Sequence, residues 1–151
     1  MRVLKKKGLH DDQAIGRSKG GLTTKIHATC DALGNPTGFH LTPGQEHDLA
    51  GADALMDKMT KANALLADKA YDADGRMRKR LEEKGCIPVI PPKSNRKNPP
   101  DYDTYAYKAR HLIENFFAKL KQFRAIATRY DKTSQNFLGA IYMASMVIWL
   151  N

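Results

Sequence analysis

The chain has 151 residues, 42% hydrophobic and 27% charged, so it can form one domain with a buried core and does not have the composition of a disordered protein. Its formal net charge is +9. Residues 1–25 carry 7 Lys/Arg and 2 acids, residues 26–103 carry 11 and 12, and residues 104–151 carry 7 and 2, which gives +5, −1 and +5. Two basic ends suit either a polyanionic partner or a simple solvated surface, and charge alone does not decide between them.

The sequence predicts no membrane partner and no disulfide. Its longest apolar stretch, residues 137–150, is shorter than the ~20 residues that span a bilayer, which favours a buried helix. Cys30 and Cys86 form no C-x-x-C pair and no secretory signal follows the basic start, so we expect reduced thiols in the cytoplasm. The five histidines (His10, His27, His40, His47 and His111) show no zinc-binding spacing with either cysteine.

The first third of the chain predicts a tail followed by a hairpin. Residues 1–20 are basic and contain glycines, which indicates a tail or loop. Residues 21–31 alternate with a period of two, which is typical of a half-buried strand. Turn residues at 33–36 and a second run at 37–42 complete the predicted hairpin.

The rest of the chain predicts helices alternating with strands. Apolar residues at helical spacing follow Asp48 to about Met59. The remaining expected elements are a strand at 64–67 that ends at Asp68, a helix from Asp72 or Asp74 to Lys84 that Gly85 ends, a strand at 86–90, an exposed basic loop at 91–103, and helices at about 104–124 and 134–150. This order predicts the α/β class, with a mixed sheet and flanking helices.

Asp68 is the first candidate for chemistry, because it stands where an apolar strand gives way to a loop. Ligand sites form at the carboxyl ends of strands in α/β sheets. The alternative is an Asp that caps the following helix, although Asp72 fits that capping role better. Position alone leaves both roles open.

Glu114 is the second candidate, because it lies within a polar stripe on the predicted helix at 104–124. Tyr107, Arg110, Glu114 and Lys121 are spaced by 3, 4 and 7 residues, so they fall on one side, next to the apolar face. The alternative is a solvent-exposed face in which Arg110 and Glu114 form an ordinary i,i+4 ion pair.

Taken together, these residues resemble a known family. The pattern Tyr107-x2-Arg110-x3-Glu114-x6-Lys121 looks like the C-terminal signature of the Asp-Asp-Glu (DDE) transposases named after insertion sequence four. Residues 66–71 resemble that family's segment around its second catalytic Asp. Four further segments are similar to the related group named after insertion sequence five: residues 16–27, 41–45, 89–92 and 112–117.

The resemblance implies a ribonuclease-H-like fold and DNA cleavage with strand transfer at an insertion sequence. Asp68 matches the second catalytic carboxylate and Glu114 the third, so both would bind metal. Tyr107, Arg110 and Lys121 match the polar positions around the Glu. Two Mg²⁺ ions, or Mn²⁺ as a substitute, would serve this phosphodiester chemistry and prefer carboxylate oxygens. The expected location is bacterial-type cytoplasm, associated with the nucleoid.

Several cations are candidates for binding the DNA backbone. The segment at 16–21 lacks the spacing of a phosphate-binding loop and precedes a strand, so at most it predicts a basic turn that faces DNA. The loop at 91–103 is as well explained by solvation. The candidates are Arg17, Lys19, Lys25, Lys93, Arg96, Lys97, Arg110 and Lys121.

The match lacks the family's first catalytic Asp and the strand that carries it. Asp11 and Asp12 lie in a polar stretch, and Asp31 precedes a turn where a turn role suffices. We therefore expect residues 21–151 to form a truncated core with open strand edges, completed by an upstream polypeptide or a full-length transposase. If it is complete enough to bind metal, Asp68 and Glu114 should lie within roughly 4–6 Å. The alternatives are a non-catalytic DNA-binding or assembly module and an inert remnant.

Overall fold

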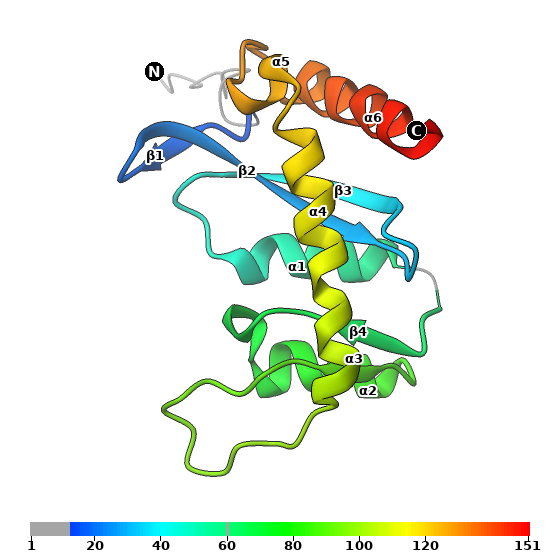
Figure 1. Ribbon diagram of the computed structural model, residues 1–151. Coiled ribbons are helices and arrows are strands. Elements are labelled where there is room, and N and C mark those ends of the chain that lie inside the picture. The colour runs from blue at the N-terminus through cyan, green and yellow to red at the C-terminus, as the bar shows by residue number, and fades with distance from the viewer. Residues whose placement is uncertain (1–12, 60) are drawn as a thin grey trace, which may run out of the picture.

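The computed structural model describes residues 13–59 and 61–151, so Asp11 and Asp12 lie outside the described residues. The strands form two sheets (Figure 1). One is antiparallel, in the order β1 (Gly16–Ser18), β2 (Gly21–Cys30), β3 (Pro36–Pro43), and the other pairs β4 (Ala64–Leu66) with β5 (Ile87–Val89) in parallel.

The two sheets confirm the α/β class and the predicted hairpin but differ from a single mixed sheet. Among the described strands, β2 beyond Thr23 pairs only with β3, and β4 pairs only with β5. No described strand therefore joins the two sheets into one. Strand β1 falls inside the segment that was expected to be a tail or loop.

The helices begin close to where the sequence places them. Gly85, predicted to end the second helix, has a positive φ of 69° just after α2, a conformation that glycine adopts without strain. The helical elements are α1 (Asp48–Lys58), the 3₁₀ turn η1 (Lys69–Tyr71), the π-helical turn η2 (Asp74–Arg78), α2 (Lys79–Glu83), α3 (Thr104–Tyr107), the 3₁₀ turn η3 (Lys108–Arg110), α4 (His111–Leu120), α5 (Arg124–Ala127) and α6 (Ser134–Leu150).

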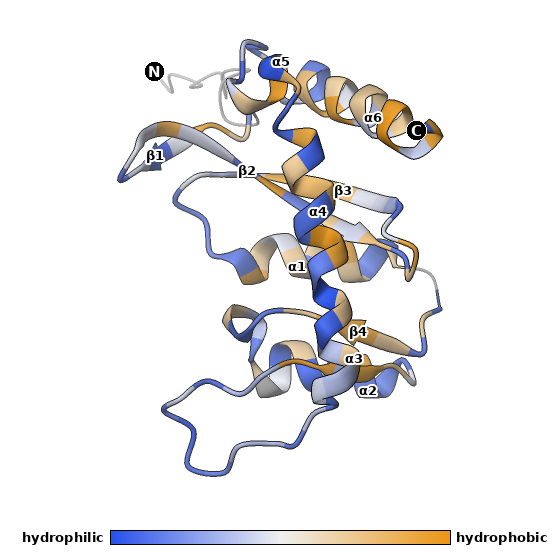
Figure 2. Ribbon diagram, viewed as in Figure 1, coloured by the Kyte–Doolittle hydropathy of each residue, from blue (hydrophilic) through white to orange (hydrophobic). Residues whose placement is uncertain are grey.

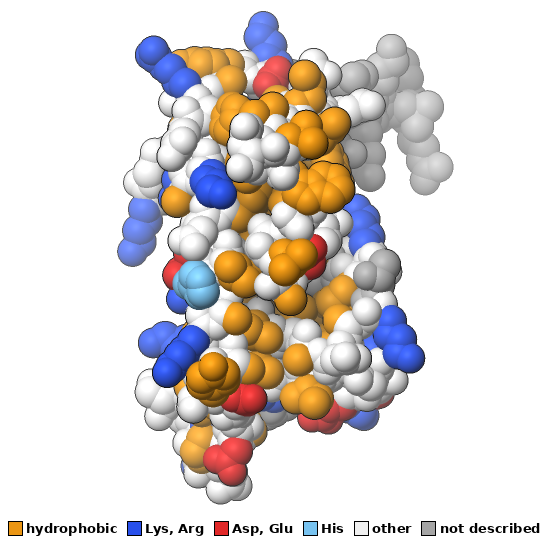
Figure 3. All heavy atoms as spheres, turned by 45° about the vertical axis from the view of Figure 1, so that its right-hand side comes forward, with side chains coloured by type: hydrophobic (Ala, Val, Ile, Leu, Met, Phe, Trp, Pro, Cys, Tyr) orange, Lys and Arg blue, Asp and Glu red, His pale blue; other side chains and the backbone are white. Residues whose placement is uncertain are grey.

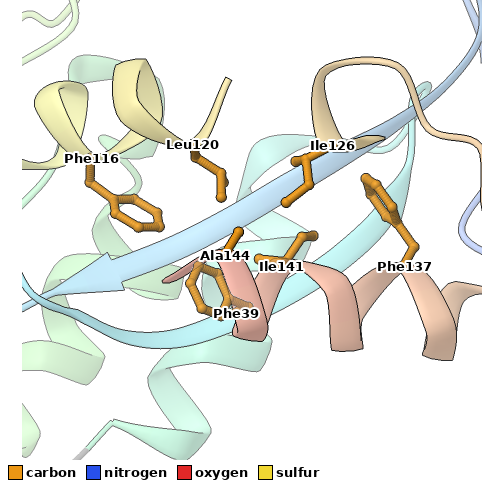
Figure 4. Packing of buried hydrophobic residues seen from close by; sticks show 7 residues of the cluster. All are labelled: Phe39, Phe116, Leu120, Ile126, Phe137, Ile141 and Ala144. Carbon is orange, nitrogen blue, oxygen red and sulfur yellow. The ribbon is translucent and has the colours of Figure 1, made fainter. Parts of the chain in front are cut away.

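One face of the β2–β3 hairpin packs on α4 and α6. Ile26 and Ala28 pair across the hairpin with Leu41 and Phe39, so their side chains share that face. They contact a cluster in which the buried side chains converge from α4, α5 and α6 (Figure 4). The cluster residues are Phe39, Phe116, Leu120, Ile126, Phe137, Ile141 and Ala144.

The opposite face of the hairpin packs on α1 and is centred on His27. This side chain is 6% exposed and its Nε2 lies 2.8 Å from the Thr42 hydroxyl. Burial lowers the pKa of His27 below its ordinary value of 6.5, so the ring is neutral at pH 7. Helix α1 crosses the ring at Gly51, where a methyl group would overlap it. The strand is thus covered on both faces, whereas its alternation predicted a half-buried one.

Helix α1 also connects the hairpin to the second sheet. Its residues Ala52 and Met56 belong to a second core cluster, with Met77, Leu81 and Ile90. In Figure 1, α1 lies between the β2–β3 hairpin above and the unit of β4, β5 and α2 below. Helix α1 therefore packs both against the β2–β3 hairpin and against the second core cluster.

The predicted helix at 104–124 is a rod of three parts, α3, η3 and α4. It runs alongside both units in Figure 1, with α3 in contact with β5 and α4 in contact with β2. The α-helix ends at Leu120, after which a turn leads into the short α5, which was not predicted. Helix α6 has the predicted bounds, and no helix among the described residues is long and apolar enough to cross a membrane.

Candidate active site

Asp68 stands at the carboxyl end of β4, as predicted, with its side chain on the surface. Its Oδ1 accepts the backbone N–H of Ala70 at 2.8 Å and caps η1. Asp68 therefore performs the capping role for which the sequence favoured Asp72. One carboxylate oxygen is used in this local bond, and the group stays accessible to a ligand.

Glu114 lies in the first turn of α4 with its side chain 55% exposed. Its Oε1 accepts a 2.6 Å hydrogen bond from Arg110, so the predicted i,i+4 ion pair is present. The Arg110 guanidinium lies 5.5 Å from the centre of the Tyr107 ring, a cation–π distance, and Tyr102 meets that ring edge-on at 5.7 Å. Tyr107, Arg110 and Glu114 thus form one connected stack.

The electrostatic surroundings of Arg110 include both Glu114 and Asp68. Burial acts to lower the pKa of Arg110, but the electrostatic influence of Tyr107, the hydrogen bond and charge of Glu114 and the charge of Asp68 outweigh it and raise the pKa. An interaction of this kind requires Asp68 to lie within electrostatic reach of the guanidinium. Two carboxylates 46 positions apart in the sequence, Asp68 and Glu114, therefore share Arg110 as a neighbour. Their separation of roughly 4–6 Å stays a prediction.

Lys121, the fourth residue of the stripe, is exposed at the C-cap of α4. It lies 7 residues beyond Glu114, which corresponds to about 10 Å along a helix. A cation at this distance can contact a phosphate one or two nucleotides away from the carboxylates, and its role there stays a prediction.

Asp72 is a buried charge that the sequence did not reveal. Its side chain is fully buried and accepts hydrogen bonds from Arg78 at 2.9 Å, from Arg96 at 2.5 and 2.8 Å, and from the Lys93 N–H at 2.8 Å. Burial acts to raise the pKa of Asp72, but these donors outweigh it and lower the pKa to about 2. Because the donors come from residues 6 to 24 positions away, no local spacing predicts them.

The Asp72 contacts fix the basic loop at 91–103 to the sheet that carries Asp68. Arg78 also donates to the Ile90 carbonyl at 2.6 Å, at the end of β5. In Figure 2 the loop is hydrophilic along most of its length. The Arg96 side chain is therefore bonded to Asp72 inside the protein. The Lys93 and Lys97 side chains are exposed on the same loop.

The other predicted DNA-binding residues also divide into those that bond within the protein and those that are exposed. Lys25 donates to the Glu46 carbonyl at 2.7 Å and to Asp48 at 2.9 Å, which links β2 to the start of α1. Arg17 and Lys19 are exposed on the β1–β2 hairpin. Arg17 and Lys19 are thus open to a ligand, whereas Lys25 has protein partners.

Asp31 stabilises the turn that follows it, which is the role that the sequence offered as the alternative to a catalytic one. Its Oδ1 accepts the N–H groups of Leu33 and Asn35, both at 2.9 Å. Hydrogen bonds from Asn35 and Leu33 lower the pKa of Asp31. Within residues 13–59 and 61–151, no group of three or more His, Cys, Asp or Glu side chains is placed to hold a metal ion, and both cysteines are free thiols.

The candidate site is an open surface. A shallow cavity of about 340 Å³ lies elsewhere, between the turn at Leu33 and α4, and its lining does not include Asp68, Arg110 or Glu114. An open surface suits a long polymer better than a small molecule, which proteins normally enclose.

The model of the transposase DDE domain matches residues 5–150. A candidate transposase of insertion sequence element IS6501 from Brucella ovis is 39% identical over 132 residues, which covers 85% of this chain and 99% of that protein. The transposase of insertion sequence element IS1106 from Neisseria meningitidis serogroup B is 28% identical over 135 residues, which covers 85% of this chain and 43% of that protein. No solved structure matches the chain.

These matches confirm the prediction of a DDE-type insertion-sequence transposase that the residues around Asp68 and Glu114 suggested. The subgroup named after insertion sequence five stays a prediction. With a family model that spans almost all of its length, the chain belongs to the transposase DDE domain family.

Proposed function

We propose that Asp68 and Glu114 are two of the catalytic carboxylates with which this transposase cuts and joins DNA at the ends of an insertion sequence. The observation that supports this most directly is the shared neighbour Arg110, which is bonded to Glu114 and lies in the electrostatic field of Asp68.

The donor set fits a hard divalent cation. Asp68 and Glu114 offer exposed carboxylate oxygens, which Mg²⁺ and Mn²⁺ prefer over nitrogen or sulfur. Bound cations would neutralise the phosphate charge and lower the pKa of an attacking water or 3′-hydroxyl. With two carboxylates the site would bind a pair of cations weakly, and a third carboxylate would complete it.

The side chains around Glu114 have separable roles in this proposal. Arg110 holds the Glu114 carboxylate in place, and Tyr107 stacks on Arg110 and keeps it from swinging into solvent. Lys121 binds a phosphate further along the DNA, together with Arg17, Lys19, Lys93 and Lys97. Lys25 and Arg96 serve the DNA indirectly, because they fix α1 and the 91–103 loop.

We also propose that the fold is ribonuclease-H-like and that a further strand lies between β2 and β4. The open edges of these two strands support the proposal, because an unpaired edge in a sheet offers backbone groups to another strand. An upstream polypeptide or a full-length transposase would supply the strand and its carboxylate. This arrangement would merge the two sheets into one.

A non-catalytic DNA-binding or assembly module is the second candidate. It is favoured by one observation, that no three metal-binding side chains cluster in the described part of the chain. Such a module would need the basic surface but would not depend on Asp68.

The test is Mn²⁺-dependent cleavage and strand transfer on DNA that carries the element's ends, with and without the upstream polypeptide. We expect activity that Asp68→Asn and Glu114→Gln abolish and that Asp101→Asn, an exposed acid in the 91–103 loop, leaves intact. Activity that survives Asp68→Asn would point to a contaminating nuclease and would remove Asp68 from the site. DNA binding without activity in any mixture would favour the non-catalytic module.

A further inference from the structure

Helix α6 has no polar side along its C-terminal half. Residues 134–151 contain no Lys, Arg, Asp, Glu or His. One half of its circumference, with Phe137, Ile141 and Ala144, lies in the core cluster (Figure 4). A helix at a protein surface normally turns charged and polar residues outward, and a helix that is apolar all round is normally buried.

The half that faces away from the core is both apolar and open. Figure 3 shows hydrophobic side chains gathered on the upper part of the molecule, where α6 lies. At ~100° per residue, five large side chains fall on this half of the helix. Their exposed fractions are 71% for Met143, 60% for Met146, 48% for Val147, 66% for Trp149 and 80% for Leu150. Tyr142 stands at the edge of this half, and its ring packs edge-on against the buried Phe39 ring at 5.1 Å.

The spacing on this open half is that of a helix–helix contact. Asn136, Gly139, Met143, Met146 and Leu150 follow one another at intervals of 3, 4, 3 and 4 residues. Side chains at these intervals form one seam along a helix, the pattern with which two helices pack side by side. At Gly139 no atom lies within 4 Å of the place of a Cβ, so a second helix can approach the backbone closely there.

We propose that the open half of α6 is a dimer interface, in which the α6 helices of two copies of this chain pack against each other about a two-fold axis. Charge supports a second copy as the occupant. Two chains that each carry +9 repel, and an uncharged face is where they can meet with least cost. A two-fold contact also needs a surface that complements itself, which a seam without charged side chains provides.

The same absence of charge disfavours other occupants. Nucleic acid is bound through Lys and Arg, and a helix that lies on a membrane surface carries them on its polar face. Residues 134–151 contain neither. The interface is also remote from the candidate active site, because α6 lies at the opposite end of the molecule from α3 and β4 (Figure 1). Dimer formation therefore does not depend on the proposed roles of Asp68 and Glu114.

The test is sedimentation equilibrium of the full chain over a wide range of concentration, without DNA. We expect a monomer–dimer equilibrium that Met146→Glu weakens tenfold or more, because each dimer would bury two uncompensated carboxylates. The matched control is Leu22→Glu, which places the same charge on another exposed apolar residue, 73% exposed on the β1–β2 hairpin, and should leave the dimer intact. Thermal melts of both variants check that the monomers stay folded.

Five results would overturn the proposal. The wild-type chain could remain monomeric at all concentrations, or form a dimer that Met146→Glu does not weaken. Association could grow without limit, or be weakened equally by Leu22→Glu, which would indicate unspecific contact. Binding of the wild-type chain to phosphatidylcholine vesicles, abolished by Met146→Glu, would assign the face to a lipid surface instead.

Discussion

Single charged residues of this protein divide into those that stabilise the fold and those that face solvent. Asp72, Arg78 and Arg96 are largely buried, with side chains 0%, 8% and 18% exposed, and both arginines donate to the Asp72 carboxylate. Asp68 and Glu114 are exposed and make one short bond each to their own segment. A carboxylate with solvent-facing oxygens is the kind that can exchange water for a metal ion.

Asp72→Asn should lower the free energy of unfolding by about 3 kcal/mol, because two guanidinium groups would lose their buried counter-charge. The matched control is Asp57→Asn. Asp57 also pairs with an arginine, Arg80, but its side chain is 69% exposed, so the loss should be below about 1 kcal/mol. Urea denaturation of both variants measures the difference, and equal losses would contradict the role given to Asp72.

The same carboxylate makes stability depend on pH. The pKa of Asp72 is about 2 in the folded chain against 3.8 for an ordinary Asp, so the unfolded chain takes up the proton first as pH falls. Its contribution, on the order of 2 kcal/mol, is present above pH 3.8 and is lost as pH falls through about 2. The stability gap between wild type and Asp72→Asn should therefore narrow over this window. A gap that is constant with pH would show that the charge of Asp72 is not involved.

Among the elements, the position of α1 is constrained from two sides, because the helix packs on the β2–β3 hairpin and on the second core cluster. Gly51 allows its close approach to the buried His27 ring. The helix cannot retreat from the ring without loosening Ala52 and Met56 on its other side.

Gly51→Ala should destabilise the protein by about 1–3 kcal/mol, although alanine is the better helix former, because the added methyl group overlaps the His27 ring. Gly75→Ala is the control, because no atom lies within 4 Å of a Cβ at Gly75. Chemical denaturation compares the two. If Gly51→Ala were as stable as wild type, α1 would not lie on β2 as described.

The positions of most elements follow from the sequence, because local signals specify them. The alternation in β2 and the glycine after α2 place these elements to within a residue or two. Contacts between distant segments have no such signal. The Asp72–Arg96 bond, the approach of Gly51 to His27 and the separation of the two sheets each depend on tertiary packing.

The candidate site shows the same limit. Spacing placed Tyr107, Arg110 and Glu114 on one stripe, and the structure shows them in one stack. The neighbourhood of Asp68 and Arg110 came only from the fold, since their segments are 42 residues apart. Spacing also could not predict that Lys97 is exposed whereas the neighbouring Arg96 forms an ion pair with Asp72.

On the scale of the whole molecule, the basic residues should act on DNA unequally. Lys97→Ala should reduce the slope of log affinity against log salt by ~0.9 without changing the melting temperature, if Lys97 contacts one phosphate. Arg96→Ala should lower the melting temperature instead, because Asp72 loses two hydrogen bonds. Lys61→Ala, at an exposed lysine outside the proposed surface, is the control for the slope. An unchanged slope for Lys97→Ala would mean that Lys97 does not contact a DNA phosphate and is simply solvated.

The central claim is that Asp68 and Glu114 belong to one metal site, and Mn²⁺ binding to the full chain, followed by electron paramagnetic resonance, tests it most directly. Asp68→Asn and Glu114→Gln should each weaken the binding of the same Mn²⁺ ion about tenfold, and the double variant should bind more weakly than either, because both carboxylates are ligands of that ion. Asp101→Asn should bind like wild type. Unchanged affinity in either single variant would mean that the two carboxylates do not share an ion.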